Sequence, residues 1–338
     1  MSERKYYHFS KAGLFYGVNT LDEAITASRE SGYIWLNYYN PEKHDLMELV
    51  DKLGIHPLSV EDCLDDKQVP KIEHFTDNTF ILFNAFHYSQ QILKIDEVNL
   101  FIGKNYLISV SGHNSDDRKP LNELEKVISG DPGNIKLGPA VLMHRILDHI
   151  VDQKFLAFES LEDELEEAED QILERPSVFD PTDLMRIRKC LQVLRKSLFH
   201  EREILVKLTR HDCPFIPEKA IAHYRDIYDH LAKFFELTET YRDNVTSLME
   251  LYSSLQNNLM TSSANETNAS VRRLTLIATV FMPLTLIASI GGMSEWSMMT
   301  GPENWKLSYP LFMLAMGIIA AVNFIIIRRI ERKGRFRI

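Results

Sequence analysis

The apolar residues of this 338-residue chain are concentrated towards its C-terminus. Residues 274–293, LTLIATVFMPLTLIASIGGM, contain no charged side chain, and a second uncharged run covers residues 307–327. A helix of about 20 residues rises ~30 Å, which matches the hydrocarbon core of a bilayer. The two runs therefore predict transmembrane helices, TM1 (274–293) and TM2 (307–327), joined by a short polar loop over residues 294–306.

The first part of the chain, residues 1–136, mixes extended and helical patterns. Four stretches rich in β-branched and aromatic residues predict strands: 33–39, 79–88, 98–103 and 106–112. The last two flank Lys104 and Asn105, which suit a tight hairpin turn. Helical patterns lie around residues 45–54 and 121–129. Together these patterns predict a layered α/β domain.

From residue 137 onward the periodicity is helical. Apolar residues spaced three or four apart form stripes in an acidic segment and again after Pro176 and Pro181, which predicts an antiparallel helical hairpin over residues 137–213. The stripe positions are Leu161, Leu165, Ala168, Ile172, Leu184, Ile187, Leu191, Leu194 and Leu198. Most acidic runs of this kind are solvated helix faces, although weak binding of divalent ions is an alternative.

A third apolar seam predicts a stalk helix over residues 214–273 that continues into TM1. Its positions are Tyr224, Tyr228, Leu231, Phe235, Thr238, Tyr241, Val245, Leu248, Tyr252, Leu255 and Leu259. A helix of ~45 residues is ~70 Å long, which is too long to bury its seam against one small domain. Copies of the same chain are its natural partners. A ring of chains could enclose a pore, with TM1 innermost because it continues the stalk.

The net charge is −10, but basic residues gather around the two apolar runs. This basic collar comprises Arg272, Arg273, Arg328, Arg329, Arg332 and Lys333. By the positive-inside rule, both chain termini face the cytoplasm, and the loop 294–306 lies outside, in the periplasm. Topology and lipid contact explain the collar without a role in gating. The N-terminus shows no signal peptide, so we expect the body of the protein to stay in the cytoplasm and the basic tail 328–338 to lie there too.

Catalytic and cofactor-binding patterns are absent from the sequence. Cys63, Cys190 and Cys213 form no CxxC arrangement, and no GxGxxG, P-loop, HExxH or GxSxG motif occurs. We therefore expect no enzyme activity, no catalytic residues, no organic cofactor and no nucleic-acid partner.

One face of TM1 carries Leu274, Ala278, Met282 and Thr285 at steps of four, four and three. If this face lines a pore, its apolar rings can gate by dewetting, while ordinary helix packing explains the spacing equally well. Pro283 removes a backbone hydrogen bond and bends the helix.

The end of TM1 offers oxygen atoms to a cation. Gly291 and Gly292 permit the chain to leave the helix and expose carbonyl oxygens, although glycines there are also typical of a simple C-cap. A ring of carbonyls and Ser294 hydroxyls suits Mg²⁺, which gives up its water reluctantly and is held through that water. Glu295 and Glu303 in the outer loop could concentrate cations, or could be solvated loop charges.

Four segments resemble the CorA metal-ion transporters. They are GIHPLSVEDCLDDKQVPKIEHFTDNTFIL at Gly54–Leu82, HYRDIYDHLAKFFELTETYRD at His223–Asp243, RRLTLIATVFMPLTLIASIGGM through TM1, and PENWK at Pro302–Lys306. The resemblance implies a funnel-shaped homopentamer with a cytoplasmic α/β domain, a long stalk helix that lines the pore, and a Gly-Met-Asn filter for hydrated cations at the outer mouth. The predicted fold class is thus an α+β membrane protein with a helical stalk and two C-terminal transmembrane helices.

The filter departs from the family pattern at its third position. Gly292 and Met293 match, whereas Ser294 replaces the asparagine, and Gly291 stands where an aromatic residue commonly precedes the motif. The resemblance assigns the pore face to Thr285, Met282, Ala278, Leu274, Val271 and Asn268. Serine is shorter than asparagine and its hydroxyl rotates freely, so the ring should be wider and a weaker cation acceptor.

The resemblance also implies regulation by Mg²⁺ bound between subunits. Glu236 occupies the matching stalk position, but the opposite segment, 89–91, offers Ser-Gln-Gln in place of an aspartate. The leading interpretation is Mg²⁺ uptake through a pentameric pore in the inner (plasma) membrane. The alternatives are a Zn²⁺, Co²⁺ or Ni²⁺ transporter, proton-coupled or not, and a non-conducting, membrane-anchored scaffold or sensor.

Overall fold

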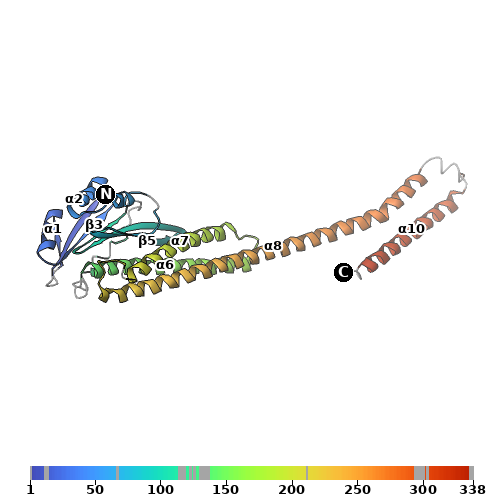
Figure 1. Ribbon diagram of the computed structural model, residues 1–338. Coiled ribbons are helices and arrows are strands. Elements are labelled where there is room, and N and C mark those ends of the chain that lie inside the picture. The colour runs from blue at the N-terminus through green and yellow to red at the C-terminus, as the bar shows by residue number, and fades with distance from the viewer. Residues whose placement is uncertain are drawn as a thin grey trace. The chain divides into compact units, whose positions relative to one another are not determined.

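The computed structural model (Figure 1) describes residues 2–10, 15–65, 68–112, 119–121, 124, 127–128, 138–210, 212–292, 301 and 304–334. It divides into two compact units, Met1–Tyr252 and Ser253–Ile338. The helix predicted around residues 121–129 lies largely outside the described residues.

A seven-stranded sheet forms the centre of the first unit. Its strands are β1 (Glu3–Phe9), β2 (Phe15–Val18), β3 (Tyr33–Tyr39), β4 (Lys71–His74), β5 (Asn78–Ser89), β6 (Ile92–Gly103) and β7 (Tyr106–Ser111). Their order across the sheet is β2-β1-β3-β7-β6-β5-β4. β3 and β7 are parallel, and every other neighbouring pair is antiparallel.

The four strands predicted from composition are confirmed as β3, β5, β6 and β7. β6 and β7 pair antiparallel across Lys104 and Asn105, as the hairpin prediction required. β6 begins at Ile92, six residues before the predicted start at Val98. The prediction missed this first part, ILKIDE, because it is half-exposed and carries charged residues. The strands β1, β2 and β4 were not predicted.

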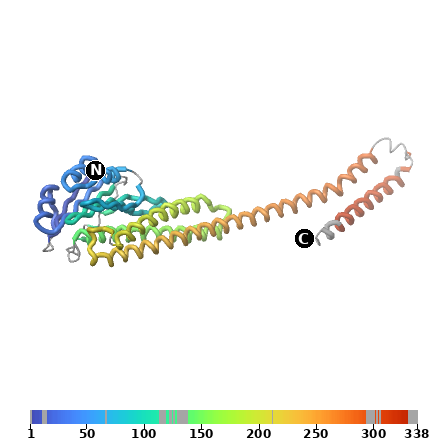
Figure 2. The backbone as a smooth tube through the Cα atoms, in the orientation of Figure 1, coloured from blue at the N-terminus to red at the C-terminus, as the bar shows by residue number. Residues whose placement is uncertain are grey.

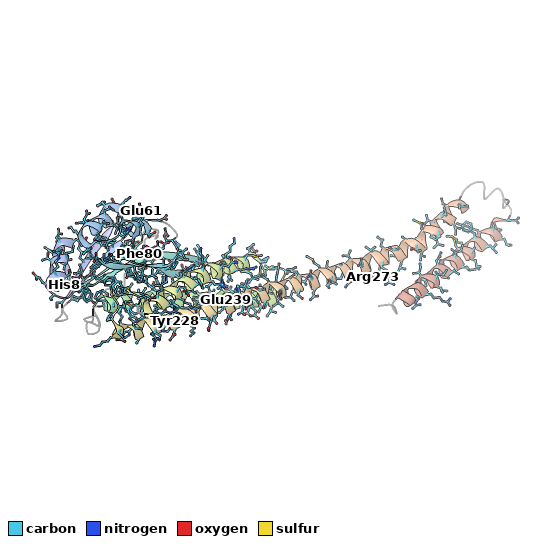
Figure 3. All side chains as sticks on the ribbon, in the orientation of Figure 1. His8, Glu61, Phe80, Tyr228, Glu239 and Arg273 are labelled. Atoms are coloured by element: carbon cyan, nitrogen blue, oxygen red, sulfur yellow. The ribbon has the colours of Figure 1, made fainter. Side chains whose placement is uncertain are left out.

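Helices cover both faces of this sheet (Figure 1). α1 (Leu21–Glu30), α2 (Lys43–Leu53) and α3 (Pro57–Asp62) close a hydrophobic core on one face, which includes Leu36, Leu46 and Phe80. α6 (Pro139–Glu174) packs against the other face, chiefly against β5. The side chains of both layers are drawn in Figure 3.

α6 and α7 (Thr182–Thr209) form the predicted helical hairpin. Every predicted stripe residue is buried: Leu161, Leu165, Ala168, Ile172, Leu184, Ile187, Leu191, Leu194 and Leu198. A short 3₁₀ helix, η1 (Glu218–Ala220), then leads into α8 (Ile221–Gly291). The tube in Figure 2 follows α6, α7 and the first part of α8 side by side.

The buried seam of α8 differs from the predicted seam at five of its eleven positions. Tyr252 and Leu255 are half-buried and Leu259 is exposed, and the other two differences lie nearer the start of the helix. Ile227 and Phe234 are buried there, whereas Tyr228 and Phe235 are only half-buried. The latter two rings lie beneath the guanidinium of Arg202 on α7, at 5.7 and 4.9 Å from ring centroid to Cζ (Tyr228 is labelled in Figure 3). A cation over an aromatic face keeps one side of the ring at the surface. Ile227 and Phe234, which lie one position earlier, therefore enter the core in place of Tyr228 and Phe235.

The second unit consists of the rest of α8 and α10 (Trp305–Gly334). Both helices are long and apolar enough to cross a membrane. In α8, all of which is described, the last buried residue is Leu248. The predicted stalk and TM1 are thus parts of a single helix.

Candidate ion pathway

The six residues assigned to the pore face lie on one side of α8. With ~100° of rotation per helical residue, Asn268, Val271, Leu274, Ala278, Met282 and Thr285 fall within an arc of about 120°. All six side chains are exposed, and Leu274 and Met282 reach 67% and 74% exposure. Exposed apolar side chains of this size require contact with lipid or with other protein chains.

The remaining circumference of this part of α8 is apolar as well. Ile277, Phe281 and Ile290 are 57%, 61% and 48% exposed. A helix that is apolar all round belongs in a membrane or in a large core. Since one chain provides no core around it, a membrane environment fits this segment.

Three threonine hydroxyls in this part of α8 donate to the backbone of their own helix. Thr275 Oγ1 donates to Val271 O at 2.9 Å, Thr279 Oγ1 to Thr275 O at 2.7 Å, and Thr285 Oγ1 to Phe281 O at 2.8 Å. Such bonds satisfy a hydroxyl without a partner outside the helix. Because the proton of Thr285 is used in this way, its oxygen presents lone pairs on the pore face.

The C-terminal end of α8 lies close to α10 at Gly291. A Cβ atom on Gly291 would lie 2.6 Å from Cζ of Phe312, so any side chain at position 291 would collide with this ring. Gly292 N donates to Ala288 O at 3.0 Å, which closes the last helical turn at the first residue of the predicted filter. The other predicted residues of the outer mouth, Met293, Ser294, Glu295 and Glu303, lie outside the described residues.

The basic collar belongs to both helices of the second unit. Arg272 and Arg273 lie in α8, and Arg328 and Arg329 lie in α10, all with exposed side chains. Arg332 and Lys333 also fall within α10, but their side chains are outside the described part of the structure.

Glu236, the predicted regulatory residue, is exposed on α8. Among the residues that the structure describes, no group of three or more His, Cys, Asp or Glu side chains could hold a metal ion. Within one chain, therefore, Glu236 is not part of a formed metal site.

The segment expected opposite Glu236 is a tight hairpin between β5 and β6. Gln90 and Gln91 have φ of 50° and 64°, which is the pattern of a two-residue type I′ turn. Arg186 of α7 fixes this hairpin: its Nη1 donates to Gln91 O at 3.2 Å and to Tyr88 Oη at 2.9 Å. Arg186 also forms an ion pair with Glu164 of α6. Nothing in the sequence singled out these contacts of Arg186, because its partners lie 22 to 98 positions away from it.

An α/β unit whose last helix, α8, continues into the first of two helices long and apolar enough to cross a membrane has the architecture of a membrane-anchored protein. The family described as CorA-like Mg²⁺ transporter protein matches residues 30–329, so this chain belongs to that family. The comparison confirms the family that the sequence motifs indicated.

Individual relatives extend over nearly the whole chain. The cobalt/magnesium transport protein CorA of Thermotoga maritima is 33% identical over 313 residues, which cover 91% of this chain and 86% of the relative. The complete structure of the CorA magnesium transporter from Methanocaldococcus jannaschii superposes with a TM-score of 0.71 at 26% identity, over 96% of this chain and 97% of that one. The zinc transport protein ZntB of Yersinia enterocolitica is 21% identical over 285 residues, covering 82% of this chain and 81% of that protein. The α/β unit, the long helix and the two apolar helices agree with the predicted fold class.

Proposed function

We propose that five copies of this chain form a channel that passes hydrated divalent cations, chiefly Mg²⁺, without breaking a covalent bond. The observation that carries this proposal is the continuity of α8. One helix contains both the seam that packs in the soluble unit and the exposed arc from Asn268 to Thr285. In a ring of copies, the exposed arcs of all the chains would face one central space.

The chemistry of the arc suits a hydrated ion. Leu274, Ala278 and Met282 would form apolar rings that bind no ion and can close by dewetting. Thr285 would add a ring of acceptor oxygens further along. At the outer mouth, the proposed filter of Gly292, Met293 and Ser294 would contact the water shell of Mg²⁺, which is shed only reluctantly.

Charge around the pathway supports one orientation. We place both termini in the cytoplasm and the outer loop, with Glu295 and Glu303, in the periplasm, where the two carboxylates would attract cations. The basic collar, represented by Arg272 and Arg328, would then meet the anionic lipid surface of the cytoplasmic leaflet of the inner membrane.

Regulation by Mg²⁺ between subunits would be weak in this protein. Glu236 could supply one carboxylate from α8, but the hairpin at Gln90 and Gln91 supplies only neutral oxygens. Replacing a carboxylate by amides lowers the charge available to a divalent cation and therefore its affinity. We expect closure only at a higher Mg²⁺ concentration than for a site with two carboxylates.

Ion flux into liposomes tests the proposal directly. Purified protein is reconstituted around a divalent-sensitive dye and challenged with Mg²⁺, Co²⁺, Ni²⁺ and Zn²⁺, while native mass spectrometry counts the subunits. Ser294→Asn should increase the preference for Mg²⁺, because the amide oxygen reaches further into the pore. Ser308→Asn, on α10, is the matched control. An absence of divalent flux refutes the channel, and an ion ranking that Ser294→Asn leaves unchanged removes Ser294 from the filter.

The second candidate is a transporter of Zn²⁺ or another transition metal, driven by protons. It is favoured by the similarity to a zinc transport protein and by the changed third residue of the filter. Flux that grows when a proton gradient is imposed would support it. A non-conducting scaffold or sensor is the third candidate, and it would fail to rescue growth at low Mg²⁺ in cells that lack other Mg²⁺ uptake.

A further inference from the structure

The first unit contains a cavity of about 500 Å³ that has no part in the proposed ion pathway. Its walls come from β5, β6 and β7, from the segment before β4 and from α7. Apolar side chains form much of this lining, among them Leu93, Ile95, Val110 and Val193. The volume is within the range of cavities that hold small organic ligands.

Polar residues interrupt an otherwise apolar face of the sheet at this cavity. In the β5–β6 register, Phe80 pairs with Phe101, Leu82 with Asn99, and Asn84 with Glu97. Directly paired residues, and those two positions further along a strand, share one face of the sheet. Phe80, Leu82 and Phe101 belong to the hydrophobic core, so Asn84, Glu97 and Asn99 are polar substitutions on the core face of the sheet.

Two of these polar side chains are buried without complete hydrogen bonding. Asn84 and Asn99 are 5% and 3% exposed, and both line the cavity. Within the described ranges, the Oδ1 atom of each has no hydrogen-bond partner. A buried carbonyl oxygen without a donor is costly, and an apolar residue at either position would remove that cost. A ligand that donates hydrogen bonds would satisfy both oxygens.

The charges around the cavity restrict the kind of ligand. Among the described residues of the wall, Asp96 and Glu97 are acidic, and the basic residue Lys196 of α7 is exposed. This balance disfavours phosphates and carboxylates. A bare metal ion is also disfavoured, because the described residues contain no cluster able to ligate one and much of the wall is apolar.

We propose that this cavity binds a small organic cation, a protonated amine or amidine with a hydrocarbon body. Its N–H groups would donate to Oδ1 of Asn84 and Asn99 after a small rotation of the two amides, and its carbon atoms would pack on Val110 and Val193. The charge of the ligand would be balanced by Glu97, which is held in place by the bond from Gln68 N to its Oε1 at 2.8 Å.

A ligand at this position would contact a network that ties the helical hairpin to the sheet. Asn84 Nδ2 donates to Ser197 Oγ at 2.7 Å, and Asn84 N donates to Glu201 Oε1 at 3.2 Å. Glu201 in turn is paired with Lys154 of α6. Occupation of the cavity should therefore stabilise the packing of α6 and α7 on β5, which supplies a route for an organic cation to act on the soluble unit.

Binding is tested on the full-length protein in detergent, by calorimetry and thermal unfolding, with agmatine and benzamidine as probes. Butane-1,4-diol is the neutral control, and Mg²⁺ alone tests for an inorganic ligand. At about 100 times Kd, a bound probe should raise Tm by roughly 5 °C. If neither amine binds, if the diol binds as well as the amines, or if Mg²⁺ displaces them at equal concentration, the proposal is wrong.

Variants locate the site. Asn99→Leu should weaken agmatine binding by about tenfold or more while the unliganded protein becomes no less stable, and Asn99→Asp should tighten it. Val193→Phe should narrow the cavity and weaken binding, whereas Val178→Phe, at a valine away from the cavity wall, is the matched control. Binding that survives both Asn99→Leu and Val193→Phe would place the ligand elsewhere. None of these measurements depends on ion flux, so the cavity and the channel succeed or fail separately.

Discussion

Replacing Lys154 by methionine should destabilise the first unit strongly, because it leaves the buried carboxylate of Glu201 without its cationic partner. Lys154 and Glu201 are both 0% exposed, and Lys154 Nζ lies 2.6 Å from Glu201 Oε1. The ammonium also lies over the rings of Phe83 and Phe86, at 4.6 and 4.1 Å from their centroids. Burial lowers the pKa of Lys154, and the facing carboxylate of Glu201 opposes this effect.

The size of the decrease in unfolding free energy depends on the hydrogen bonds that Glu201 retains. Breaking a buried ion pair by removing one partner typically costs about 3–5 kcal/mol. In Lys154→Met, Glu201 still accepts from Asn84 N at 3.2 Å and from Ser197 Oγ at 3.3 Å, so we expect about 3 kcal/mol. The unit ends at residue 252, and at ~2.1 cal/mol/K per residue its unfolding entropy is about 0.5 kcal/mol/K. The expected decrease in Tm is therefore roughly 6 °C.

Thermal unfolding of the full chain, followed by the fluorescence of the buried Trp35, measures this decrease. Lys154→Met/Glu201→Gln should regain most of the stability, because a neutral amide keeps the bonds from Asn84 and Ser197 without a stranded charge. Lys189→Met, at an exposed lysine on α7, should change Tm little. A loss below about 1 kcal/mol in the single variant, or a double variant no more stable than it, would refute the reasoning.

Three further substitutions test other parts of the structure. Gly291→Ala should lower the thermal stability of the reconstituted oligomer by about 1–3 kcal/mol, and Phe312→Ala should relieve the clash in the double variant. Burial, aided by the charge of His223, lowers the pKa of His144 to about 4. Because this pKa lies below that of the unfolded chain, stability should fall as pH drops from about 6.5 to 4, by ~2 kcal/mol at pH 5, and urea unfolding of His144→Gln should lack this loss. Gly32→Ala should lower Tm by several degrees, since φ is +81° and the added Cβ would lie 1.9 Å from a backbone oxygen.

Strands covered on both faces were predictable from the sequence. β5 and β7 read as continuous apolar runs because α6 lies on one face and the core of α1–α3 on the other. The strand β1, ERKYYHF, carries charges at its start and pairs with the short edge strand β2, so its composition does not distinguish it from a loop. Its pairing with β3 is a long-range contact, which local composition cannot reveal.

The helical seam shows a different limit. Tyr228 and Phe235 lie one position after Ile227 and Phe234, and both pairs fit a heptad. The position of Arg202 on a different helix decides which pair is buried, and no local pattern contains that information. Similarly, Lys154 appears in the sequence only as the last basic residue before an acidic run, and its partner lies 47 positions away.

For the candidate pathway, the sequence predicts more of the residues than the structure of a single chain can identify. The family motifs and the four, four, three spacing predict the pore face, whereas the structure adds that these side chains are exposed and that Gly291 lies against the ring of Phe312. In the proposed channel, the choice of ion would depend on Ser294, and the effect of this residue on an ion shell would be a property of the assembled ring.

In the proposed channel, regulation and selectivity would lie on opposite sides of Pro283 in α8. Leu274 and Ala278 precede Pro283, in the same stretch of hydrogen-bonded helix as the stalk, so any rotation of the stalk in its packing against α6 and α7 also turns these two rings. Pro283 lacks the N–H that would bond to the carbonyl of Thr279, and this makes it the natural place for the helix to flex. Thr285 and the filter residues follow that point. In the proposed channel, a signal from the first unit would therefore act first on the apolar rings, whereas the choice of ion would be made beyond the proline. A change at Ser294 should then alter the ion ranking without altering the response to a cytoplasmic ligand.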